Sequence, residues 1–551
     1  MPECSVYEYM YWNNEKYPSD IALNYFGNKI SYGELFENID KAAKAFNALG
    51  VKPEEIVTIV SISTVSSIVC FYALNRIGAV SDFVNVLSET DELRFYFEEA
   101  KSRTVVTLDM FGEKVVKAAE GSNVEHIVTF SVDDYMPVSA KMGYKLQSRG
   151  ADKKWQKSGK IILWNDFMKL AKDKPAITFK KDAGKMALLA HTGGTTGIPK
   201  AVMISDFTMN YIADYYTHCF TYTRGQVWGN VMIPFVIYGI LTCMHMPLSL
   251  GLTIAVIPKF DVREWKQYIK KYHFNYVLGV PSYVNPLVDD KRQEDIDLSG
   301  LYVCGVGGDG MNNEMEEKIN RFFRDHGADI EIQKGYGLSE IGSTAVTTLN
   351  GINKIGSVGI PLIHNNIMIY NCETGRELKY GETGEICLQC PSRMIGYLDN
   401  EEATKDLFWK HEDGNEWLHT GDLGYVDEDG FLFLVGRMKR IILTTGGGVA
   451  YKVFPNMIES ILDEHKATLQ SCVVGAIDNE NQVLRAFCMV GNGTLEKTDE
   501  IECELRHSCE EKLPKHARPR FYEFCTQLPL TTVGKVDYRA LEKKSAELNE
   551  N

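Results

Sequence analysis

The sequence comprises 551 residues, of which 44% are hydrophobic and 11% aromatic, and it carries a formal net charge of −15 at pH 7. This length predicts roughly three or four domain-sized units, and the negative charge argues against nucleic acid or an anionic membrane as a partner. The 13 scattered cysteines are typical of free thiols in a reducing compartment. No stretch approaches about 18 uninterrupted apolar residues and no signal-peptide pattern opens the chain, so we expect a cytoplasmic protein without a transmembrane segment.

The first part of the chain alternates helical and strand-like patterns. Ser31 and Glu34 fit a capping box, and apolar residues then recur at helical spacing. Residues 55–61 form a short β-branched run, and residues 63–77 predict a second helix. This alternation predicts an α/β fold in which helices cover a parallel sheet. Residues 132–160 are polar and have no clear period, so we expect a solvated surface insertion there.

A loop rich in glycine and threonine follows the apolar run at residues 186–190. Glycines let backbone N–H groups turn toward an anion, and hydroxyl groups and an ammonium group add further donors. The loop therefore predicts a phosphate site or, if it binds nothing, a mobile polar turn. It is not a Walker A loop, because Pro199 precedes Lys200 and Ala201 follows it. Its candidate phosphate-binding residues are Thr192, Gly193, Gly194, Thr195, Thr196, Gly197 and Lys200.

A second glycine cluster, residues 305–310, fits the pattern G-x-G-x-x-G. It precedes a predicted helix over residues 312–326, with Asp329 and Glu331 where a ribose-binding acid is expected. Taken alone, this pattern indicates an NAD(P)-binding dehydrogenase. Residues 335–340, which come next, fit a different nucleotide site better.

Residues 387–390 form a single C-x-x-C pair on a predicted strand. Zinc is not expected to bind this pair, because no second pair lies nearby. Two buried or half-exposed thiols are the better interpretation.

Five motifs occur in the order found in the adenylate-forming superfamily, which comprises acyl-CoA synthetases, adenylation domains and beetle luciferases. The chain resembles this superfamily over nearly its whole length and is most similar to acyl-CoA synthetases. The resemblance implies a large N-terminal domain, residues 1–438, of stacked α/β sheets with a β-barrel-like part. It also implies a small mobile α+β C-terminal domain, residues 439–551, with its hinge at Lys439. The motifs are residues 192–200, 307–309 with 335–340, 418–424, 436–440 and 528–537.

The resemblance also implies the chemistry. ATP and Mg²⁺ activate a carboxylic acid as an acyl-AMP, pyrophosphate leaves, and the acyl group then passes to the thiol of CoA. Lys535 and Lys200 are implied as catalytic residues, and Glu340 as a catalytic residue that holds Mg²⁺, a cation that prefers oxygen ligands. Beyond the glycine- and threonine-rich loop, the implied ATP- and CoA-binding residues are Gly307, Gly308, Asp309, Tyr336, Gly337, Ser339, Asp422, Arg437, Gly446 and Gly447.

Several of these residues have a specific implied role. Tyr336 offers an aromatic face to adenine, and Ser339 donates to the α-phosphate. Asp422 accepts hydrogen bonds from both ribose hydroxyls, which requires an anionic acceptor with two oxygens. Ile237 and Tyr238 are implied to face the acyl group, although core packing explains two such residues equally well.

The acceptor of the acyl group stays open between two candidates. CoA is favoured because the chain carries no obvious carrier domain, and the alternative is a stand-alone adenylation enzyme that loads a carrier protein. The NAD(P)-binding dehydrogenase is the alternative from another class. The sequence also leaves open the identity of the acid, the oligomeric state and the role of residues 132–160.

Overall fold

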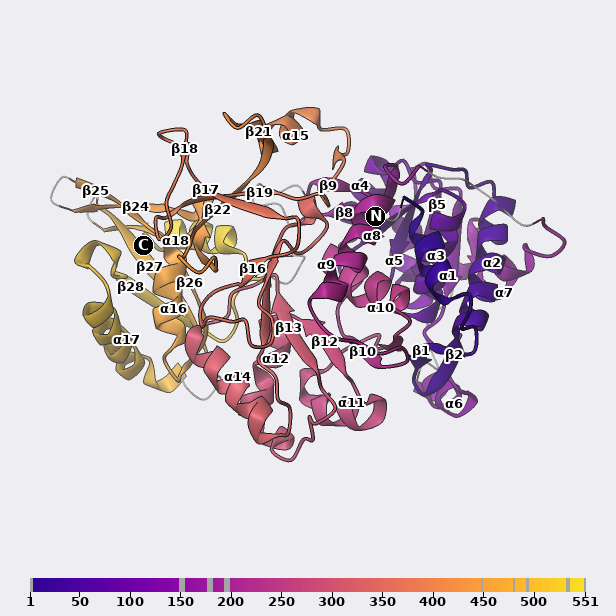
Figure 1. The fold of residues 1–551 in the computed structure, drawn as a ribbon, viewed down its shortest axis with the longest axis horizontal. Helices are drawn as coiled ribbons and strands as arrows, with labels where there is room; N and C mark the ends of the chain where they lie inside the picture. The colour runs from indigo at the N-terminus through magenta and orange to yellow at the C-terminus, as the bar shows by residue number, and fades with distance from the viewer. Residues whose placement is uncertain are drawn as a thin grey trace.

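The computed structural model describes residues 3–147, 154–175, 182–192, 199–446, 449–478, 481–491, 495–531 and 536–549. It is a mixed α/β protein with a large N-terminal part and a smaller C-terminal part, drawn in yellow and light orange in Figure 1. The expected fold class is therefore confirmed.

The first large sheet has eight strands in the order β20-β9-β8-β4-β3-β5-β6-β7. The six strands β8, β4, β3, β5, β6 and β7 run parallel to one another. β9 pairs antiparallel with β8, and β20 pairs antiparallel with β9. This is the parallel sheet that the strand–helix alternation predicts. The strands are β3 (Ile56–Val60), β4 (Val80–Val84), β5 (Thr104–Leu108), β6 (His126–Phe130), β7 (Ile161–Leu163), β8 (Met186–His191), β9 (Ala201–Ser205) and β20 (Gly396–Tyr397).

The second large sheet has nine strands in the order β16-β15-β14-β13-β12-β10-β11-β1-β2. Its centre is parallel and both ends are antiparallel. Ligands of such sheets bind at the carboxyl ends of parallel strands. The strands are β1 (Ile21–Tyr25), β2 (Asn28–Ser31), β10 (Val227–Asn230), β11 (Thr253–Val256), β12 (Tyr276–Gly279), β13 (Val303–Gly307), β14 (Gln333–Tyr336), β15 (Val346–Thr347) and β16 (Ile360–Pro361).

A third, antiparallel sheet of six strands is the part that the resemblance describes as barrel-like. Its order is β18-β17-β19-β22-β21, and β23 also pairs with β22. The long strand β22 therefore connects three neighbours. The strands are β17 (Asn366–Asn371), β18 (Arg376–Glu377), β19 (Gly384–Gln389), β21 (Phe408–Lys410), β22 (Glu416–Val426) and β23 (Leu432–Arg437).

Helices cover both large sheets. The predicted capping box at the start of α2 is confirmed: the Glu34 N–H donates to Ser31 Oγ (3.2 Å), and the Ser31 N–H donates to Glu34 Oε2 (2.8 Å). The N-terminal helices are α1 (Val6–Asn14), α2 (Tyr32–Ala48), α3 (Val65–Arg76), α4 (Thr90–Glu99), α5 (Gly112–Ala118), α6 (Val138–Gln147), α7 (Trp164–Lys169), α8 (Asp206–Tyr215), α9 (Ile237–Ile240), α10 (Met246–Ser249), α11 (Trp265–Tyr272), α12 (Pro281–Val284), α13 (Pro286–Asp289), α14 (Asn313–Asp325) and α15 (Glu401–Leu407).

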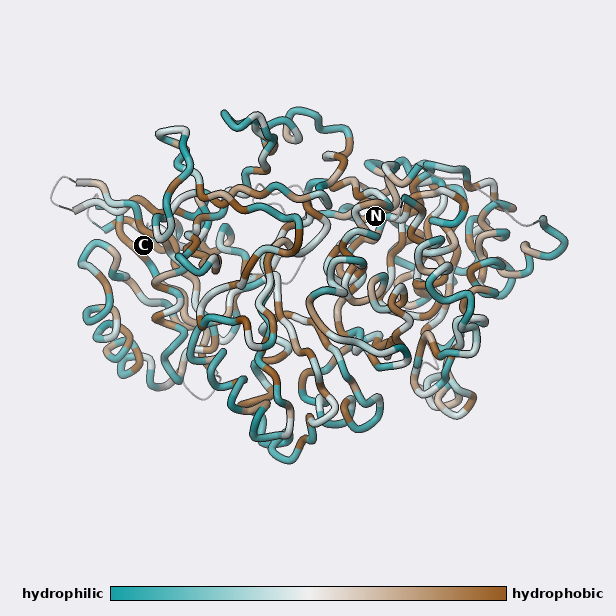
Figure 2. Tube along the Cα trace, in the orientation of Figure 1, coloured by the Kyte–Doolittle hydropathy of each residue, from teal (hydrophilic) through white to brown (hydrophobic). Residues whose placement is uncertain are grey.

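Burial follows hydropathy closely. Nearly every residue of α3 is buried, as expected for a helix that is apolar on all sides. Figure 2 shows hydrophobic segments along the interior strands and largely hydrophilic outer helices such as α14. Within the described ranges, no helix has the length and apolar character needed to cross a membrane.

Residues 132–160 differ from the expected solvated loop. They contain α6 and a 3-10 turn, Lys154–Lys157. α6 is a short helix in which polar and small residues separate the few apolar ones, so the sequence shows no wide apolar stripe at helical period. Two of its apolar residues, Val138 and Met142, are mostly exposed. Lys141 of α6 lies 3.6 Å from the buried Asp133, which fixes the helix to the chain before it.

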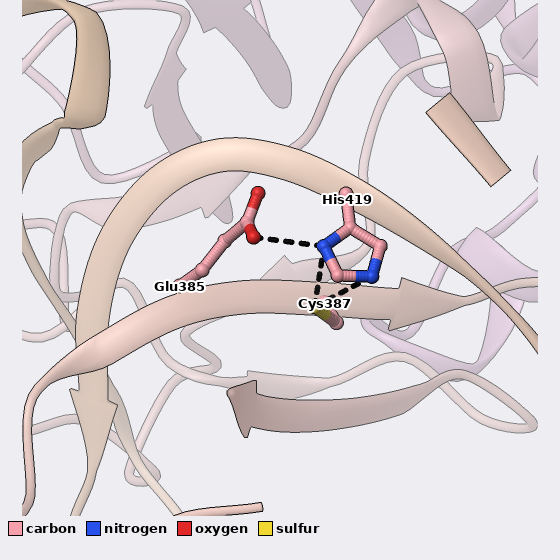
Figure 3. Close-up of side chains that lie close together, drawn as sticks. All are labelled: Glu385, Cys387 and His419. Carbon is pink, nitrogen blue, oxygen red and sulfur yellow. Dashed lines mark hydrogen bonds and ion pairs between the residues drawn. The ribbon is translucent and has the colours of Figure 1, made fainter. Parts of the chain in front are cut away.

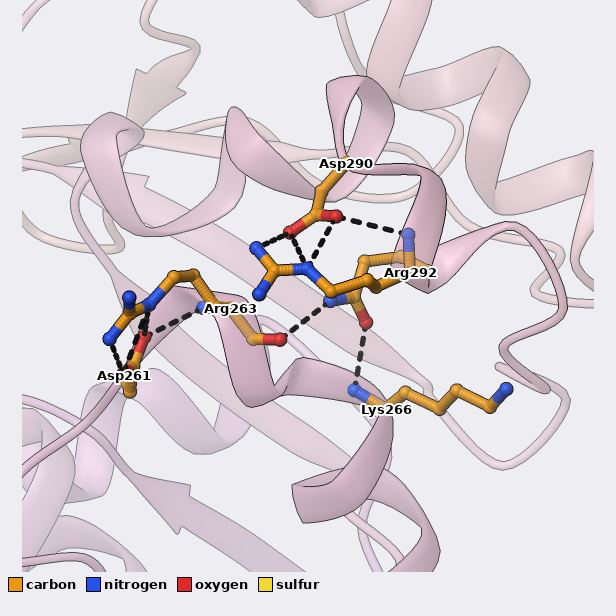
Figure 4. Close-up of polar contacts among 6 residues, drawn as sticks. Asp261, Arg263, Lys266, Asp290 and Arg292 are labelled. Carbon is orange, nitrogen blue, oxygen red and sulfur yellow. Dashed lines mark hydrogen bonds and ion pairs between the residues drawn. The ribbon is translucent and has the colours of Figure 1, made fainter.

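A polar network at the edge of the second sheet joins the start of α11 to the 3-10 turn Lys291–Gln293 (Figure 4). The buried Gln293 accepts from the Lys266 N–H (3.0 Å) and donates to the Arg263 carbonyl (2.9 Å). A buried amide that is paired on both sides stabilises such a junction more than local exposed ion pairs do. The ion pairs beside it are Arg263–Asp261 and Arg292–Asp290.

The C-terminal part has its own hydrophobic packing. Its two hydrophobic clusters draw all their described members from residues 442–541. Among the described residues of this part are a two-stranded hairpin, a three-stranded sheet and three α-helices. The elements are β24 (Ile442–Gly446), β25 (Val449–Val453), α16 (Pro455–Asp463), β26 (Thr468–Asp478), β27 (Asn481–Val490), α17 (Thr498–Lys512), β28 (Phe521–Cys525) and α18 (Tyr538–Asn549).

Candidate active site

A cavity of about 1190 Å³ is lined by residues of all three sheets of the N-terminal part and of the C-terminal part. The strands β8, β13 and β14 end at or beside it. Many residues singled out in the sequence lie on its wall, although they come from segments far apart in the chain. They are Thr192, Lys200, Ile237, Tyr238, Gly307, Gly308, Asp309, Gly337, Ser339, Glu340, Arg437 and Lys439.

The glycine- and threonine-rich loop leaves β8 and returns as β9. These strands pair antiparallel, and the Thr192 N–H donates to the Lys200 carbonyl (3.0 Å), which closes the base of the loop. Five of the predicted phosphate-binding residues lie outside the described residues: Gly193, Gly194, Thr195, Thr196 and Gly197.

His191 is the last residue of β8 and lines the cavity, and it was not singled out in the sequence. Its Nε2 is 2.7 Å from Asp82 Oδ1, and its Nδ1 is 3.7 Å from Glu99 Oε2. Burial alone would lower the pKa of His191, but the two carboxylates outweigh burial and raise it. The parallel pairing of β4 with β8 brings Asp82 to this position, and no local sequence pattern signals it.

Glu340 and Lys200 are connected through one aromatic side chain. The Tyr397 hydroxyl donates to Glu340 Oε1 (2.8 Å), and the Lys200 ammonium nitrogen lies 4.5 Å from the centre of the Tyr397 ring. Burial, and then the Glu340 carboxylate, raise the pKa of Tyr397. The sequence motifs did not identify Tyr397 either, because only the pairing of β20 with β9 places it beside Lys200.

Asp422 is held from two sides. It is the register partner of Arg437 across β22 and β23, and Arg437 Nε lies 2.9 Å from Asp422 Oδ1. The Tyr336 hydroxyl donates to Asp422 Oδ2 (2.8 Å). The Tyr336 ring is buried in the cluster between the second and third sheets, so the described geometry gives Tyr336 the role of orienting Asp422.

The packing of the backbone explains why position 337 is a glycine. A Cβ atom at this position would lie 1.7 Å from the Ser343 carbonyl oxygen, so the backbone leaves no room for any side chain. The glycine is therefore required by close packing of the chain on itself, whereas the sequence indicated only close approach of a ligand.

Replacing Gly337 with alanine is expected to destabilise the protein by roughly 3 kcal/mol, because the contact is with backbone that cannot move aside. Gly310→Ala is the matched control, since a Cβ there meets nothing within 4 Å. Thermal unfolding should show a clear drop in melting temperature for Gly337→Ala alone. Equal melting temperatures for the two variants would contradict the close contact.

The comparisons with known proteins agree with this geometry. Residues 10–398 match the AMP-binding enzyme family, and residues 457–535 match the AMP-binding enzyme C-terminal domain. The chain belongs to the AMP-binding enzyme family. It is 29% identical to a long-chain-fatty-acid–CoA ligase of Bacillus subtilis, covering 97% of this chain and 93% of that one. It is 27% identical to a probable 4-coumarate–CoA ligase 1 of Dictyostelium discoideum, covering 91% and 87%.

Solved structures share the fold of this AMP-binding enzyme. The anthranilate CoA ligase AuaEII in complex with anthranoyl-AMP superposes with a TM-score of 0.84 at 19% identity, covering 100% of this chain and 99% of that one. ATP-bound MatB from Rhodopseudomonas palustris gives 0.82 at 21% identity, covering 98% and 99%. The resemblance inferred from the sequence is thus confirmed.

Family membership decides against the dehydrogenase interpretation of residues 305–310 in this AMP-binding enzyme. The structure supplies a physical reason. In a dinucleotide fingerprint the glycine turn leads directly into the helix whose N-terminus faces the pyrophosphate. Here β13 ends at Gly307 and α14 starts only at Asn313, after a separate N-cap residue, Asn312.

The described geometry does not bring every predicted residue to the cavity. Tyr336 and Asp422 are buried and are not among the described residues that line it. Gly446 pairs with Val449 at the end of the β24–β25 hairpin and is not among the described residues that line the cavity. Gly447 and Lys535 lie outside the described residues. Lys439 is exposed within the 3-10 turn Met438–Arg440, between the paired Arg437 and the C-terminal part.

Proposed function

We propose that this enzyme activates a carboxylic acid with ATP as an acyl-AMP, releases pyrophosphate, and transfers the acyl group to CoA. The observation that carries the proposal is the convergence of Lys200, Glu340 and Arg437, the ion-pair partner of Asp422, on one cavity with an apolar wall. A carboxylate and a triphosphate repel each other, so catalysis requires a site that aligns and neutralises both. The CoA ligases among its relatives support the same activity.

The polar side of the cavity fits ATP bound with Mg²⁺. Mg²⁺ usually takes one or two carboxylates together with substrate phosphates, and Glu340 lies on the cavity wall with Ser339 beside it. When bound, the cation supplies charge neutralisation to the phosphates. Lys200 and the glycine- and threonine-rich loop hold the phosphates, and Asp422 accepts the ribose hydroxyls.

Replacing Glu340 with glutamine is expected to lower the rate of adenylation at least tenfold (about 1.4 kcal/mol), because the amide loses the charge that Mg²⁺ requires. Raised Mg²⁺ should restore part of the rate. Asp329→Asn is the matched control, since Asp329 is exposed and belongs only to the rejected dehydrogenase pattern. Pyrophosphate release at limiting Mg²⁺ measures the adenylation rate of both variants. Equal rates for Glu340→Gln and Asp329→Asn would contradict the role of Glu340.

The apolar side of the cavity favours a carboxylic acid substrate whose acyl group is hydrophobic. Ile237 and Tyr238 lie on this wall together with neighbouring apolar residues. Burial of such a group contributes about 25 cal/mol per Å². The apolar residues nearest to them in the sequence are Val231, Met232, Ile233, Phe235 and Val236.

The proposal is tested by pyrophosphate release with ATP, Mg²⁺ and a panel of fatty, aryl and short polar acids, with and without CoA. We expect release with the apolar acids and an acyl-CoA product when CoA is present. Release followed by transfer only to a phosphopantetheinyl carrier protein would favour the stand-alone adenylation enzyme. Absence of release with every acid would overturn the proposal.

Four further assignments belong to the proposal. We place the domain boundary at Met438–Lys439 and the catalytic lysine at Lys535; in support, Tyr538, three positions after Lys535, lines the cavity. Gly446 and Gly447 serve the CoA step after rotation of residues 439–551. We also propose the cytoplasm as the compartment, which the 13 free cysteines support.

A further inference from the structure

A second cluster of chemically distinctive residues lies in the third sheet, beside the cavity. Glu385, Cys387 and His419 each offer one ligand atom, and these atoms all lie within 4.8 Å of one another (Figure 3). All three residues are buried. Nothing in the proposed reaction uses them.

The sheet explains how these three residues meet. Glu385 and Cys387 are two residues apart on β19, so their side chains point to the same face of the sheet. His419 on β22 is the direct register partner of Cys387. By the same alternation Cys390 belongs to the opposite face, where it packs in another hydrophobic cluster. The C-x-x-C pair is therefore two separate buried thiols, as expected, and Cys387 has different partners.

We propose that Glu385, Cys387 and His419 bind a zinc ion. A sulfur, an imidazole nitrogen and a carboxylate oxygen form a typical zinc donor set, with bond lengths of about 2.0–2.3 Å. Tetrahedral coordination with these lengths separates sulfur from nitrogen by about 3.5 Å. Cys387 Sγ lies 3.6 Å from His419 Nδ1, which fits this geometry.

The remaining contacts support the same ligand atoms. His419 Nδ1 lies 2.8 Å from Glu385 Oε2 as a hydrogen bond, and zinc would replace the shared proton and open this pair by about 0.5 Å. The other ring nitrogen, Nε2, lies 2.9 Å from His411 Nε2. A metal-bound histidine normally donates from its second nitrogen to a neighbouring acceptor, and His411 provides it.

The outer contacts hold the carboxylate and close the site. The Gly421 N–H donates to Glu385 Oε1 (2.9 Å), and the Trp409 ring lies 3.9 Å from the His419 ring. Glu385 and His419 also line the large cavity, so water can complete the coordination as the fourth ligand. Binding forms the zinc–sulfur and zinc–nitrogen bonds. The Cys387 thiol proton leaves to solvent, and the proton of His419 moves from Nδ1 to Nε2, which faces His411.

The position gives the ion a structural role. Gly421, which Glu385 holds, immediately precedes Asp422 in β22. A zinc ion on Glu385 and His419 would therefore stiffen the segment of β22 that carries Asp422 and lines the cavity with Thr420 and Gly421.

The experiment uses the full-length protein without an affinity tag. The chain is stripped with a chelator, incubated with Zn²⁺ alone, freed of excess metal by gel filtration, and its zinc is measured by mass spectrometry. We expect close to one zinc per chain, and at least tenfold weaker zinc binding for Cys387→Ala and for His419→Ala in competition with a chromophoric chelator. Cys390→Ala is the matched control and should bind as the wild type does, because Cys390 points to the other face.

The cobalt spectrum of the wild type is a second readout, and it needs no variant to fold. Co²⁺ bound to the wild type should show a thiolate-to-cobalt charge-transfer band, and Zn²⁺ should remove it. Zn²⁺ should also raise the melting temperature of the wild type and of Cys390→Ala but not that of Cys387→Ala. Wild-type protein that retains no zinc, or cobalt spectra without the thiolate band, would overturn the proposal.

Discussion

Replacing Lys535 with alanine is expected to reduce formation of the acyl-AMP by at least about 100-fold, the typical effect of losing one donor that stabilises a developing negative charge. The same variant should still convert supplied acyl-AMP and CoA to acyl-CoA and AMP, because that step does not require a charge bridge between the carboxylate and the α-phosphate. Pyrophosphate release measures the first half-reaction, and acyl-CoA formed from synthetic acyl-AMP measures the second.

Lys439→Pro is expected to have the reciprocal effect. Proline fixes φ near about −65°, a value compatible with the 3-10 turn in which Lys439 lies, but it prevents rotation to other values. The variant should therefore make acyl-AMP and fail to transfer it. Lys439→Ala removes the same charge and keeps backbone freedom, so it should catalyse both steps. If Lys535→Ala and Lys439→Pro lost the same half-reaction, this would rule out the model in which one rotating domain presents a different face to the site in each step.

Asp422→Ala is expected to raise the KM for ATP by about 10- to 150-fold, which corresponds to about 1.5–3 kcal/mol for hydrogen bonds to a charged acceptor. The KM for the acid should change little, because the proposed role of Asp422 is to accept the ribose hydroxyls of ATP. Steady-state kinetics with each substrate varied in turn measures the two values. Tyr336→Phe removes only the hydroxyl that orients Asp422, so it should give a smaller shift in the same direction.

Equal increases in both KM values for Asp422→Ala would indicate general misfolding. Melting temperatures of the two variants distinguish that outcome, since Asp422 is buried and loss of its partners at Tyr336 and Arg437 also affects packing.

Local patterns made part of this architecture predictable. The capping box at Ser31 depends only on residues three positions apart, and the sequence motifs identified Lys200, Glu340 and Arg437 as residues of one site. His191 and Tyr397 were not predictable, because their partners Asp82 and Glu340 lie more than 100 and more than 50 positions away in the sequence. The Glu385–Cys387–His419 cluster was missed for a related reason. Its strongest local signal, the C-x-x-C pair, directs attention to Cys390, which strand alternation places on the other face.

Tyr397 has a consequence for the electrostatics of the phosphate site. Its ring lies under the Lys200 ammonium group while its hydroxyl binds Glu340, and within the described part of the chain no ion pair joins Lys200 to Glu340 directly. The Tyr397 side chain thus separates the two charges, because its ring contacts the Lys200 ammonium group and its hydroxyl donates to the Glu340 carboxylate. A direct ion pair would have to be broken before a nucleotide could enter, whereas this arrangement leaves a positive and a negative group preorganised for phosphate and cation.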